Sequence, residues 1–118
     1  MKKTSMFLGV SIALLSIALT GCPERIRIGD ITNDPGRYHD REVTVVGRVV
    51  RSYGAAGTGV YEIDDGTGKL WVATEKYGVP SKDTYIGVTG RVIPGVTWSG
   101  RNYGNGMHET RRRTRENR

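Results

Sequence analysis

The sequence predicts an all-β protein, a small five-stranded barrel with one or two short helices. Apolar and polar residues alternate with a period of two along most of the chain between residues 42 and 93, as they do in strands with one buried face. The strand-forming run VTVVGRVV at Val43–Val50 is nearly repeated as IGVTGRVI at Ile86–Ile93. Because a sheet this small would leave exposed edges, we expect it to close into a barrel.

The alternation also gives the positions of the elements. It predicts strands at 42–52, 59–64, 69–75 and 84–93, and a fifth within the glycine-rich stretch 96–109. The segment Asp64–Gly68 (DDGTG) contains the residues of a tight hairpin, so the second and third strands should pair. Short helices are predicted at Asp30–Tyr38, where Pro35 suits a first turn, and at Lys76–Lys82.

Each strand residue is assigned to a face of the barrel by the same alternation. The residues expected to point inward are Val43, Val45, Val49, Ile63, Leu70, Val72, Ile86, Val88 and Val92. The residues expected to point outward are Trp71, Arg48 and Arg91. Gly47 and Gly90 occupy the same place in the two similar runs. We expect them to be the bend points at which the first and fourth strands curl around the barrel.

The N-terminal residues have the features of an export signal. A basic start precedes an apolar run from Met6 to Leu19, which is shorter than the roughly 20 residues of a membrane-spanning helix. The run ends in the sequence LTGC at Leu19–Cys22, which resembles the lipobox of bacterial lipoproteins. The resemblance implies a signal peptide at residues 1–21, cleavage before Cys22, and lipid attachment at Cys22. The alternative is an ordinary secretory signal, although Cys22 is the only cysteine of the chain.

Acyl chains such as palmitate on Cys22 would anchor the protein to a membrane of the cell envelope. Pro23 follows the acceptor in place of the aspartate of an inner-membrane retention signal. In a bacterium with two membranes the resemblance therefore favours the periplasmic side of the outer membrane. The expected organisation after the signal peptide is a lipidated tether at 22–29, a folded domain at 30–107 and a basic disordered tail at 108–118.

The folded domain resembles the OB-fold over roughly Ile28–Val96. The residues that carry the resemblance form the patterns I-x-D-I-x-x-D-P-x-x-Y, V-x-V-x-G-x-V, Y-x-I-D-D-x-T-G-x-L-x-V and I-x-V-x-G-x-V. These are similar to the tRNA-anticodon-binding-like families and to small periplasmic OB-fold proteins of bacteria. OB-folds bind oligonucleotides, sugars, metals and proteins, so the resemblance implies a binding module and leaves its ligand open. After Val96 the glycine-rich TWSGRNYGNGM replaces the usual last strand, so closure by the fifth strand is open.

Positive charge is concentrated outside the expected domain. Without Lys2 and Lys3, 16 basic residues stand against 12 acidic ones, a net charge of +4. Met107–Arg118 holds five arginines and two glutamates, a net +3, which leaves +1 for the domain. This balance does not predict a basic nucleic-acid-binding face. The tail arginines are compatible with a solvated end, contact with anionic lipid headgroups, or capture of a polyanion; they include Arg111, Arg112, Arg113 and Arg115.

The candidate ligand-binding residues are Trp71, Arg48, Arg91 and Lys69. An outward aromatic side chain with arginines nearby can stack on a nucleic-acid base. The alternative is that Trp71 covers the barrel exterior and packs against Trp98 or Tyr103. The sequence therefore provides one candidate aromatic contact and leaves two roles open for it.

We expect no enzyme activity, no metal and no cofactor other than the covalent lipid. Cys22 is assigned to the anchor, His39 and His108 have no visible nucleophile or carboxylate partner, and the histidines lack metal-ligand spacing. The expected function is a lipid-anchored binding module that interacts with another envelope component, such as a protein partner. The alternative is binding of single-stranded nucleic acid or another polyanion through the barrel face and the arginine-rich tail. The oligomeric state is not predicted.

Overall fold

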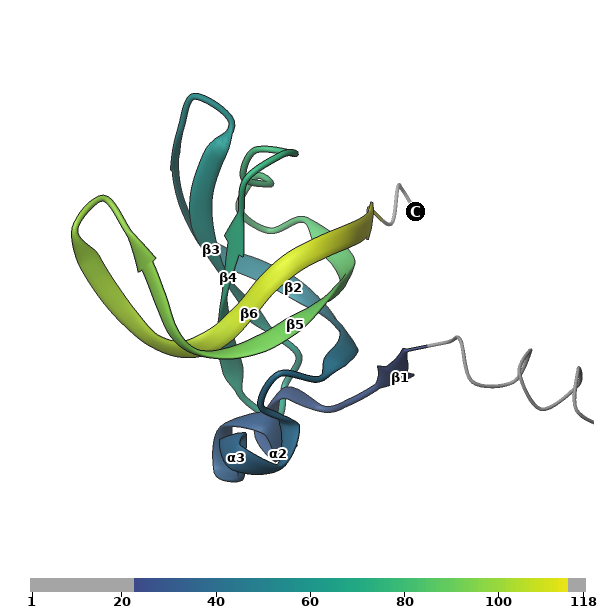
Figure 1. Ribbon diagram of the computed structural model, residues 1–118. Helices are drawn as coiled ribbons and strands as arrows, with labels where there is room; N and C mark the ends of the chain where they lie inside the picture. Colours follow the sequence, from purple (N-terminus) through teal and green to yellow (C-terminus); the bar gives the residue numbers. More distant parts are fainter. Residues whose placement is uncertain (1–22, 115–118) are drawn as a thin grey trace, which may run out of the picture.

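The computed structural model describes residues 23–114 (Figure 1). The predicted signal peptide, the predicted lipid acceptor Cys22 and the tail residue Arg115 lie outside the described residues. The elements in chain order are β1 (Glu24–Arg25), α2 (Ile28–Asn33), α3 (Pro35–Tyr38), β2 (Glu42–Ala55), β3 (Thr58–Asp64), β4 (Lys69–Thr74), β5 (Tyr85–Trp98) and β6 (Arg101–Thr114).

The five long strands form a closed barrel, which confirms the predicted OB-fold. They follow one another around the barrel in the order β2, β3, β4, β6, β5, and pairing between β2 and β5 closes it. The β4–β6 pair is parallel, and the other barrel pairs are antiparallel. The short strand β1 adds to the first residues of β2 in parallel. The fifth strand, whose role was left open, is thus the one that joins β4 to β5.

The barrel interior contains the apolar side chains that alternation placed there, and all nine predicted inward residues are buried. Tyr61 and Met107 complete this core from β3 and β6. Helices α2 and α3 lie at one end of the barrel (Figure 1), where Ile28 and Ile31 join the core. Since a fully buried aliphatic side chain contributes about 1.5–3 kcal/mol, this core is the main source of stability.

Gly47 and Gly90 lie where neighbouring backbones approach closely. A Cβ atom on Gly47 would lie 2.5 Å from the Asp64 carbonyl oxygen, and one on Gly90 would lie 2.4 Å from the His108 carbonyl oxygen. The register of β5 against β6 shifts between Thr89 and Gly90, whereas β2 shifts later, between Val49 and Arg51. Both glycines therefore allow contacts that a side chain would block.

The prediction of a disordered tail from residue 108 was wrong for residues 108–114. These residues form the second half of β6, and Arg111, Arg112 and Arg113 pair with Thr89, Val88 and Gly87 of β5. A run of charged residues is typical of a solvated end, but β5 offers it a partner strand over its whole length. Tertiary pairing thus overrides the local composition.

The helix predictions were correct in part. The first helical segment is split into α2 and α3 at Asp34, because a residue that precedes proline disfavours the helical conformation. The helix predicted at Lys76–Lys82 was wrong, and no helix is present there. Gly78 has φ +71° and Pro80 follows, so this segment forms a loop instead.

Candidate functional site

Three aromatic side chains from different strands stack on the outside of the barrel, and we call them the aromatic surface: Tyr53 of β2, Trp71 of β4 and Tyr103 of β6. The ring centroids of Trp71 and Tyr103 are 4.6 Å apart. Tyr53 lies 6.0 Å from Trp71 and 6.3 Å from Tyr103, with its ring nearly parallel to the ring of Trp71. Tyr53 is 43% exposed, so the cluster is open to a ligand on this side.

The end of the β5–β6 hairpin brings Tyr103 to Trp71. Gly106 pairs with Trp71, and a Cβ atom at Gly106 would lie only 2.2 Å from the Trp71 carbonyl oxygen, so β6 passes very close to β4. Near the tip, the Trp98 indole nitrogen donates a hydrogen bond of 3.2 Å to the Thr58 hydroxyl. Of the two packing partners considered for Trp71, Tyr103 is therefore the one that contacts it.

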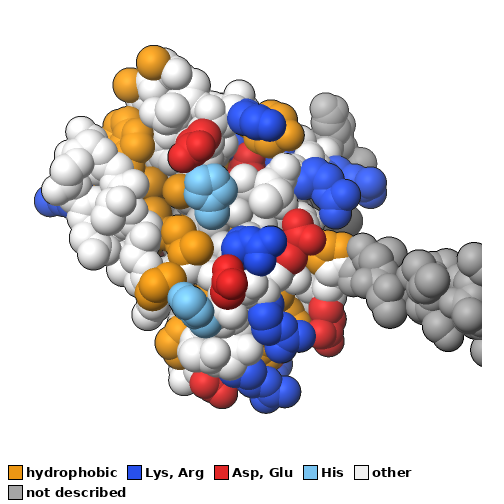
Figure 2. All heavy atoms as spheres, viewed as in Figure 1, with side chains coloured by type: hydrophobic (Ala, Val, Ile, Leu, Met, Phe, Trp, Pro, Cys, Tyr) orange, Lys and Arg blue, Asp and Glu red, His pale blue; other side chains and the backbone are white. Residues whose placement is uncertain are grey.

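Charges around the aromatic surface are balanced. Arg51 pairs with Glu62 across β2 and β3 at 3.7 Å, and Glu62 lies opposite Trp71 in the sheet. Lys69 lies opposite Asp64, two residues before Trp71 on the same strand. Acidic and basic side chains are also interspersed over the face of the molecule shown in Figure 2. The aromatic surface therefore carries no strong local field of one sign.

The structure does not gather the predicted binding residues at one place. Arg48 forms an ion pair with Asp83 at 3.0 Å. Arg91 donates to the Asp40 backbone carbonyl at 2.8 Å and lies 3.6 Å from the Asp40 carboxylate. Only Lys69 shares a strand face with Trp71.

Tyr53 was missed because the alternation changes phase along β2. Counting by twos from the inward Val49 would point Tyr53 inward as well. The register shift between Val49 and Arg51 inserts one residue and turns Arg51 and Tyr53 outward. No signal in the sequence marks this shift, so the aromatic surface could not be assembled from the pattern alone.

A buried polar network lies between β3, β4 and β6. The Tyr61 hydroxyl and the Thr74 hydroxyl both donate to the Glu109 carboxylate. The Arg112 guanidinium lies 3.1 Å from the same carboxylate and also donates to the Gly78 carbonyl in the loop after β4. Burial, and then the neighbouring Glu109 charge, raise the pKa of Tyr61 far above its usual value. Tyr61 is therefore a neutral donor at every physiological pH.

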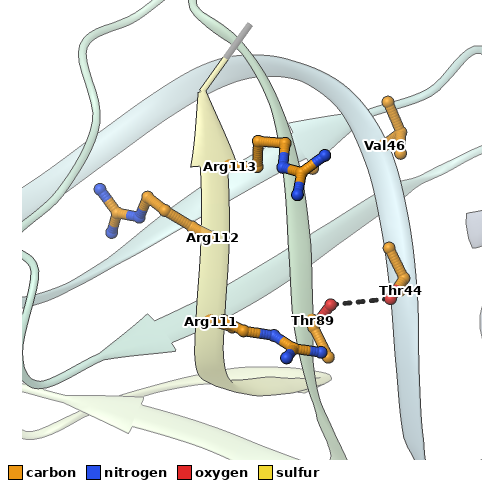
Figure 3. A pocket seen from close by; sticks show the side chains of 7 residues that line it. Thr44, Val46, Thr89, Arg111, Arg112 and Arg113 are labelled. Carbon is orange, nitrogen blue, oxygen red and sulfur yellow. Dashed lines mark hydrogen bonds between the residues drawn. The ribbon is translucent and has the colours of Figure 1, made fainter. Parts of the chain in front are cut away.

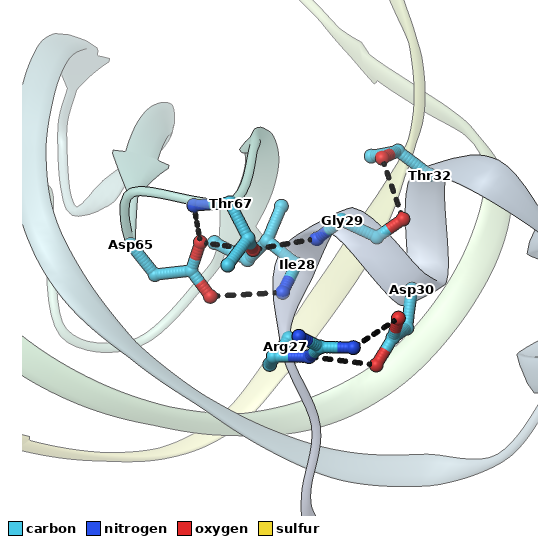
Figure 4. A network of polar contacts seen from close by, with 7 residues as sticks. All are labelled: Arg27, Ile28, Gly29, Asp30, Thr32, Asp65 and Thr67. Carbon is cyan, nitrogen blue, oxygen red and sulfur yellow. Dashed lines mark hydrogen bonds and ion pairs between the residues drawn. The ribbon is translucent and has the colours of Figure 1, made fainter.

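The β3–β4 hairpin caps the first helix (Figure 4). The Asp65 carboxylate accepts a hydrogen bond of 2.9 Å from the Ile28 amide, and the Thr67 hydroxyl accepts one of 2.8 Å from the Gly29 amide. Burial opposes the charged form of Asp65, but hydrogen bonds from Ile28, Thr67 and Gly68 outweigh it, so its pKa lies below the usual value. The GTGK sequence at Gly66–Lys69 thus belongs to a structural turn.

A concave region, which we call the basic groove, lies on the outside of β2, β5 and β6 (Figure 3). It has a volume of about 450 Å³ and is lined by Thr44, Val46, Gly87, Thr89, Arg111, Arg112 and Arg113. Arg111 and Arg113 extend toward the threonines, while Arg112 extends to the opposite side (Figure 3), where it meets Glu109. Alternation along β6 therefore separates one structural arginine from two exposed ones.

Two features are absent from residues 23–114. No helix among them is long and apolar enough to cross a membrane. They also contain no group of three or more histidine, cysteine, aspartate or glutamate residues arranged to hold a metal ion.

No model of a protein family matches the chain, and no curated protein matches it. Among solved structures, the OBody AM3L09 bound to hen egg-white lysozyme matches with a TM-score of 0.51 and 18% identity, over 66% of this chain and 84% of that one. A protein described as an aspartyl-tRNA synthetase from Leishmania major Friedlin matches with a TM-score of 0.59 and 11% identity. That match covers 88% of this chain and 26% of the synthetase. At such identities the likeness shows the fold alone.

Proposed function

We propose that this protein is a noncatalytic, lipid-anchored binding module of the bacterial cell envelope, and that it binds a protein partner through the aromatic surface. The observation that carries the proposal is the stacking of Tyr53, Trp71 and Tyr103 on an outer face whose charges are balanced. Tyrosine and tryptophan are the residues most enriched among the contacts that dominate protein–protein affinity. They offer a large apolar area at a low cost in conformational entropy.

The charge balance favours a protein partner over a nucleic acid. Binding of a single strand draws much of its affinity from neutralising phosphates, which requires several free cations along the groove. Around the aromatic surface Arg51 is paired with Glu62, and Lys69 has Asp64 opposite to it. A neutral aromatic face suits the apolar centre of a protein interface.

The aromatic surface is tested by crosslinking in intact envelopes. Cells that carry the wild-type chain, a Trp71→Ala variant and a Tyr85→Ala variant are crosslinked, and the adducts are identified by mass spectrometry. Tyr85 is an exposed tyrosine outside the aromatic surface and serves as the matched control. We expect one protein adduct that is lost in Trp71→Ala and kept in Tyr85→Ala. The same adducts in all three strains, or none, would argue against the proposal.

The lipid anchor is proposed from the LTGC sequence at Leu19–Cys22. Metabolic labelling with a palmitate analogue should label the wild-type chain and leave Cys22→Ser unlabelled. Cell fractionation should place the labelled chain with the outer membrane in a two-membrane bacterium. If the wild-type chain takes up no acyl group, the lipid anchor is contradicted and the N-terminal residues are better explained as an ordinary secretory signal.

Binding of single-stranded nucleic acid is the second candidate function, and the stacked rings are the observation that favours it. An aromatic ring contributes about 1–3 kcal/mol for each base stacked on it. Fluorescence anisotropy with labelled single-stranded DNA and RNA decides the matter. Binding that persists at physiological salt and falls about tenfold or more in Trp71→Ala would establish it. Binding that is unchanged in this variant would exclude the aromatic surface as a nucleic-acid site.

A further inference from the structure

Two threonines flanked by arginines form one row across four neighbouring strands. Arg25 of β1 pairs with Thr44 of β2, Thr44 pairs with Thr89 of β5, and Thr89 pairs with Arg111 of β6. Paired residues of neighbouring strands point to the same side of a sheet. The row therefore places two threonines between two arginines on the outside of the barrel, and of these two arginines Arg111 lines the basic groove.

The next row leaves open space beside the hydroxyls. It consists of Val46, Gly87 and Arg113. Gly87 contributes no side chain, and the nearest atom that a Cβ would meet is a Val46 methyl group at 3.6 Å. The basic groove is thus a concave region with small residues at its base. Its β6 side carries two arginines (Figure 3).

The two groove arginines are available for an anion. No salt bridge among residues 23–114 involves Arg111 or Arg113, and both are exposed. The acidic residue of β2 is Glu42, which accepts a hydrogen bond from the Thr110 hydroxyl at 3.1 Å. Positive charge on the groove side of β6 is therefore left without an acidic partner within this part of the chain.

The threonines can also donate. The Thr44 and Thr89 hydroxyl oxygens are 2.7 Å apart and share one hydrogen bond. Whichever hydroxyl accepts in this bond keeps its own proton for another acceptor. A phosphate group that two arginines hold is an acceptor of this kind, since guanidinium groups bind phosphate oxygens through paired hydrogen bonds.

We propose that the basic groove binds the phosphate of anionic phospholipid headgroups and so orients the barrel on the membrane. The choice of lipid rests on the proposed anchor at Cys22. Arg25 is three residues beyond Cys22, so the first strand of the row lies within about 11 Å of the attachment site along the chain. Arg111 is three strand spacings, about 14 Å, from β1.

Together these lengths place Arg111 no more than about 25 Å from Cys22, so the tether is short enough for the groove to reach headgroups, whose charge acts over about 8–10 Å at physiological ionic strength. An anchor at Cys22 therefore holds the groove near the headgroups. In Figure 1, β1 and the C-terminal end of β6 lie on the same side of the barrel. The row of paired residues connects them across that side.

The test uses a chain that starts at Pro23, because every residue of the core cluster lies between Ile28 and Met107. Its binding is measured by sedimentation with phosphatidylcholine vesicles, with and without phosphatidylglycerol. We expect binding only with phosphatidylglycerol, and about 30-fold weaker binding for the double variant Arg111→Ala, Arg113→Ala, which corresponds to about 1 kcal/mol for each arginine. Because this chain carries no lipid, the result does not depend on whether Cys22 is acylated.

A matched control separates the groove from net charge. The double variant Arg37→Ala, Arg101→Ala removes the same charge from exposed positions outside the groove and should bind almost as well as wild type. The double variant Thr44→Val, Thr89→Val keeps both groove arginines and should lose several-fold in affinity. Circular dichroism and a thermal melt establish that each variant is folded before it is compared.

Four outcomes would overturn the proposal. Equal losses in both arginine double variants would mean diffuse attraction, and equal binding to both vesicle types would mean no headgroup site. If single-stranded DNA binding fell in the groove variant while vesicle binding did not, the groove would be a nucleic-acid site. In NMR, soluble short-chain phosphatidylglycerol should shift the Thr44 and Thr89 amide signals. Inorganic phosphate that binds there as tightly as the lipid would contradict a lipid site.

Discussion

The aromatic surface and the basic groove are built on the same strands but differ in chemistry. Strands β2 and β6 contribute to both: Tyr53 and Tyr103 to the first, Thr44 and Arg111 to the second. The first region is made of stacked rings among paired charges, and the second is concave with arginines that lack an acidic partner among residues 23–114. Along β6 the aromatic residue comes near the start and the groove arginines near the end, whereas along β2 the groove residue Thr44 comes first and Tyr53 lies near the end, so one long strand can carry two sites of different chemistry.

Removal of Arg112, the partly buried arginine of β6, should destabilise this strand and so affect both regions. Arg112→Ala leaves the Glu109 carboxylate, whose side chain is fully buried, without its cation. We expect a loss of roughly 3–5 kcal/mol in the free energy of unfolding, measured by urea denaturation. The neighbouring Arg111→Ala is the control, and it should change stability by less than about 0.5 kcal/mol because Arg111 is exposed. Similar losses for both would contradict the network.

A methyl group at Gly106 should disturb the aromatic surface and spare the groove. Because its Cβ would collide with the Trp71 carbonyl, Gly106→Ala should cost about 1–3 kcal/mol in unfolding free energy and alter the Trp fluorescence. At Gly95 the nearest atom to a new Cβ is at 3.9 Å, so Gly95→Ala should be nearly neutral. If Gly106→Ala weakened vesicle binding as much as partner binding, the two regions would not be separable.

Removal of the Trp71 ring should weaken binding at the aromatic surface and leave binding at the basic groove unchanged. Trp71→Ala should lower the affinity for the protein partner by about 2 kcal/mol, roughly 30-fold, as expected for a central aromatic contact. Vesicle binding should stay within about twofold of wild type, since Trp71 does not line the groove. Both affinities are measured on the same preparation. A parallel loss of vesicle binding would mean that the aromatic surface also touches the membrane.

The smallest effect should come from the cap at the far end of the barrel. The lowered pKa of Asp65 means that its contribution to stability is present above the pKa of an unfolded aspartate, about 3.9, and is lost as pH falls through the folded value. Asp65→Asn should cost about 1 kcal/mol at neutral pH and flatten the acid limb of the stability curve. Asp64→Asn, whose partner is the Gly66 amide within the turn, is the control. Both binding activities should persist.

The sequence predicted the barrel and its core because one buried face imposes a period of two. The nine inward residues from Val43 to Val92 follow that period and are buried. The aromatic surface escaped prediction because the shift after Val49 reverses the phase at Tyr53. The buried network escaped it because Tyr61 and Glu109 are 48 positions apart in the chain. Residues 108–114 form a strand because they pair with β5. No local property of these residues predicts that pairing.

Strand β6 also has a consequence for the order in which the chain can fold. It is the last strand among residues 23–114, yet it fills the place between β4 and β5 and completes the ring. A chain that emerges with its N-terminus first can form the β2–β3–β4 meander early, but the cylinder stays open until residues near Thr114 have emerged. The parallel contact with β4 joins distant positions, and such contacts form slowly. Completion of the barrel therefore waits until β6 has emerged and is not gradual during synthesis of the earlier strands.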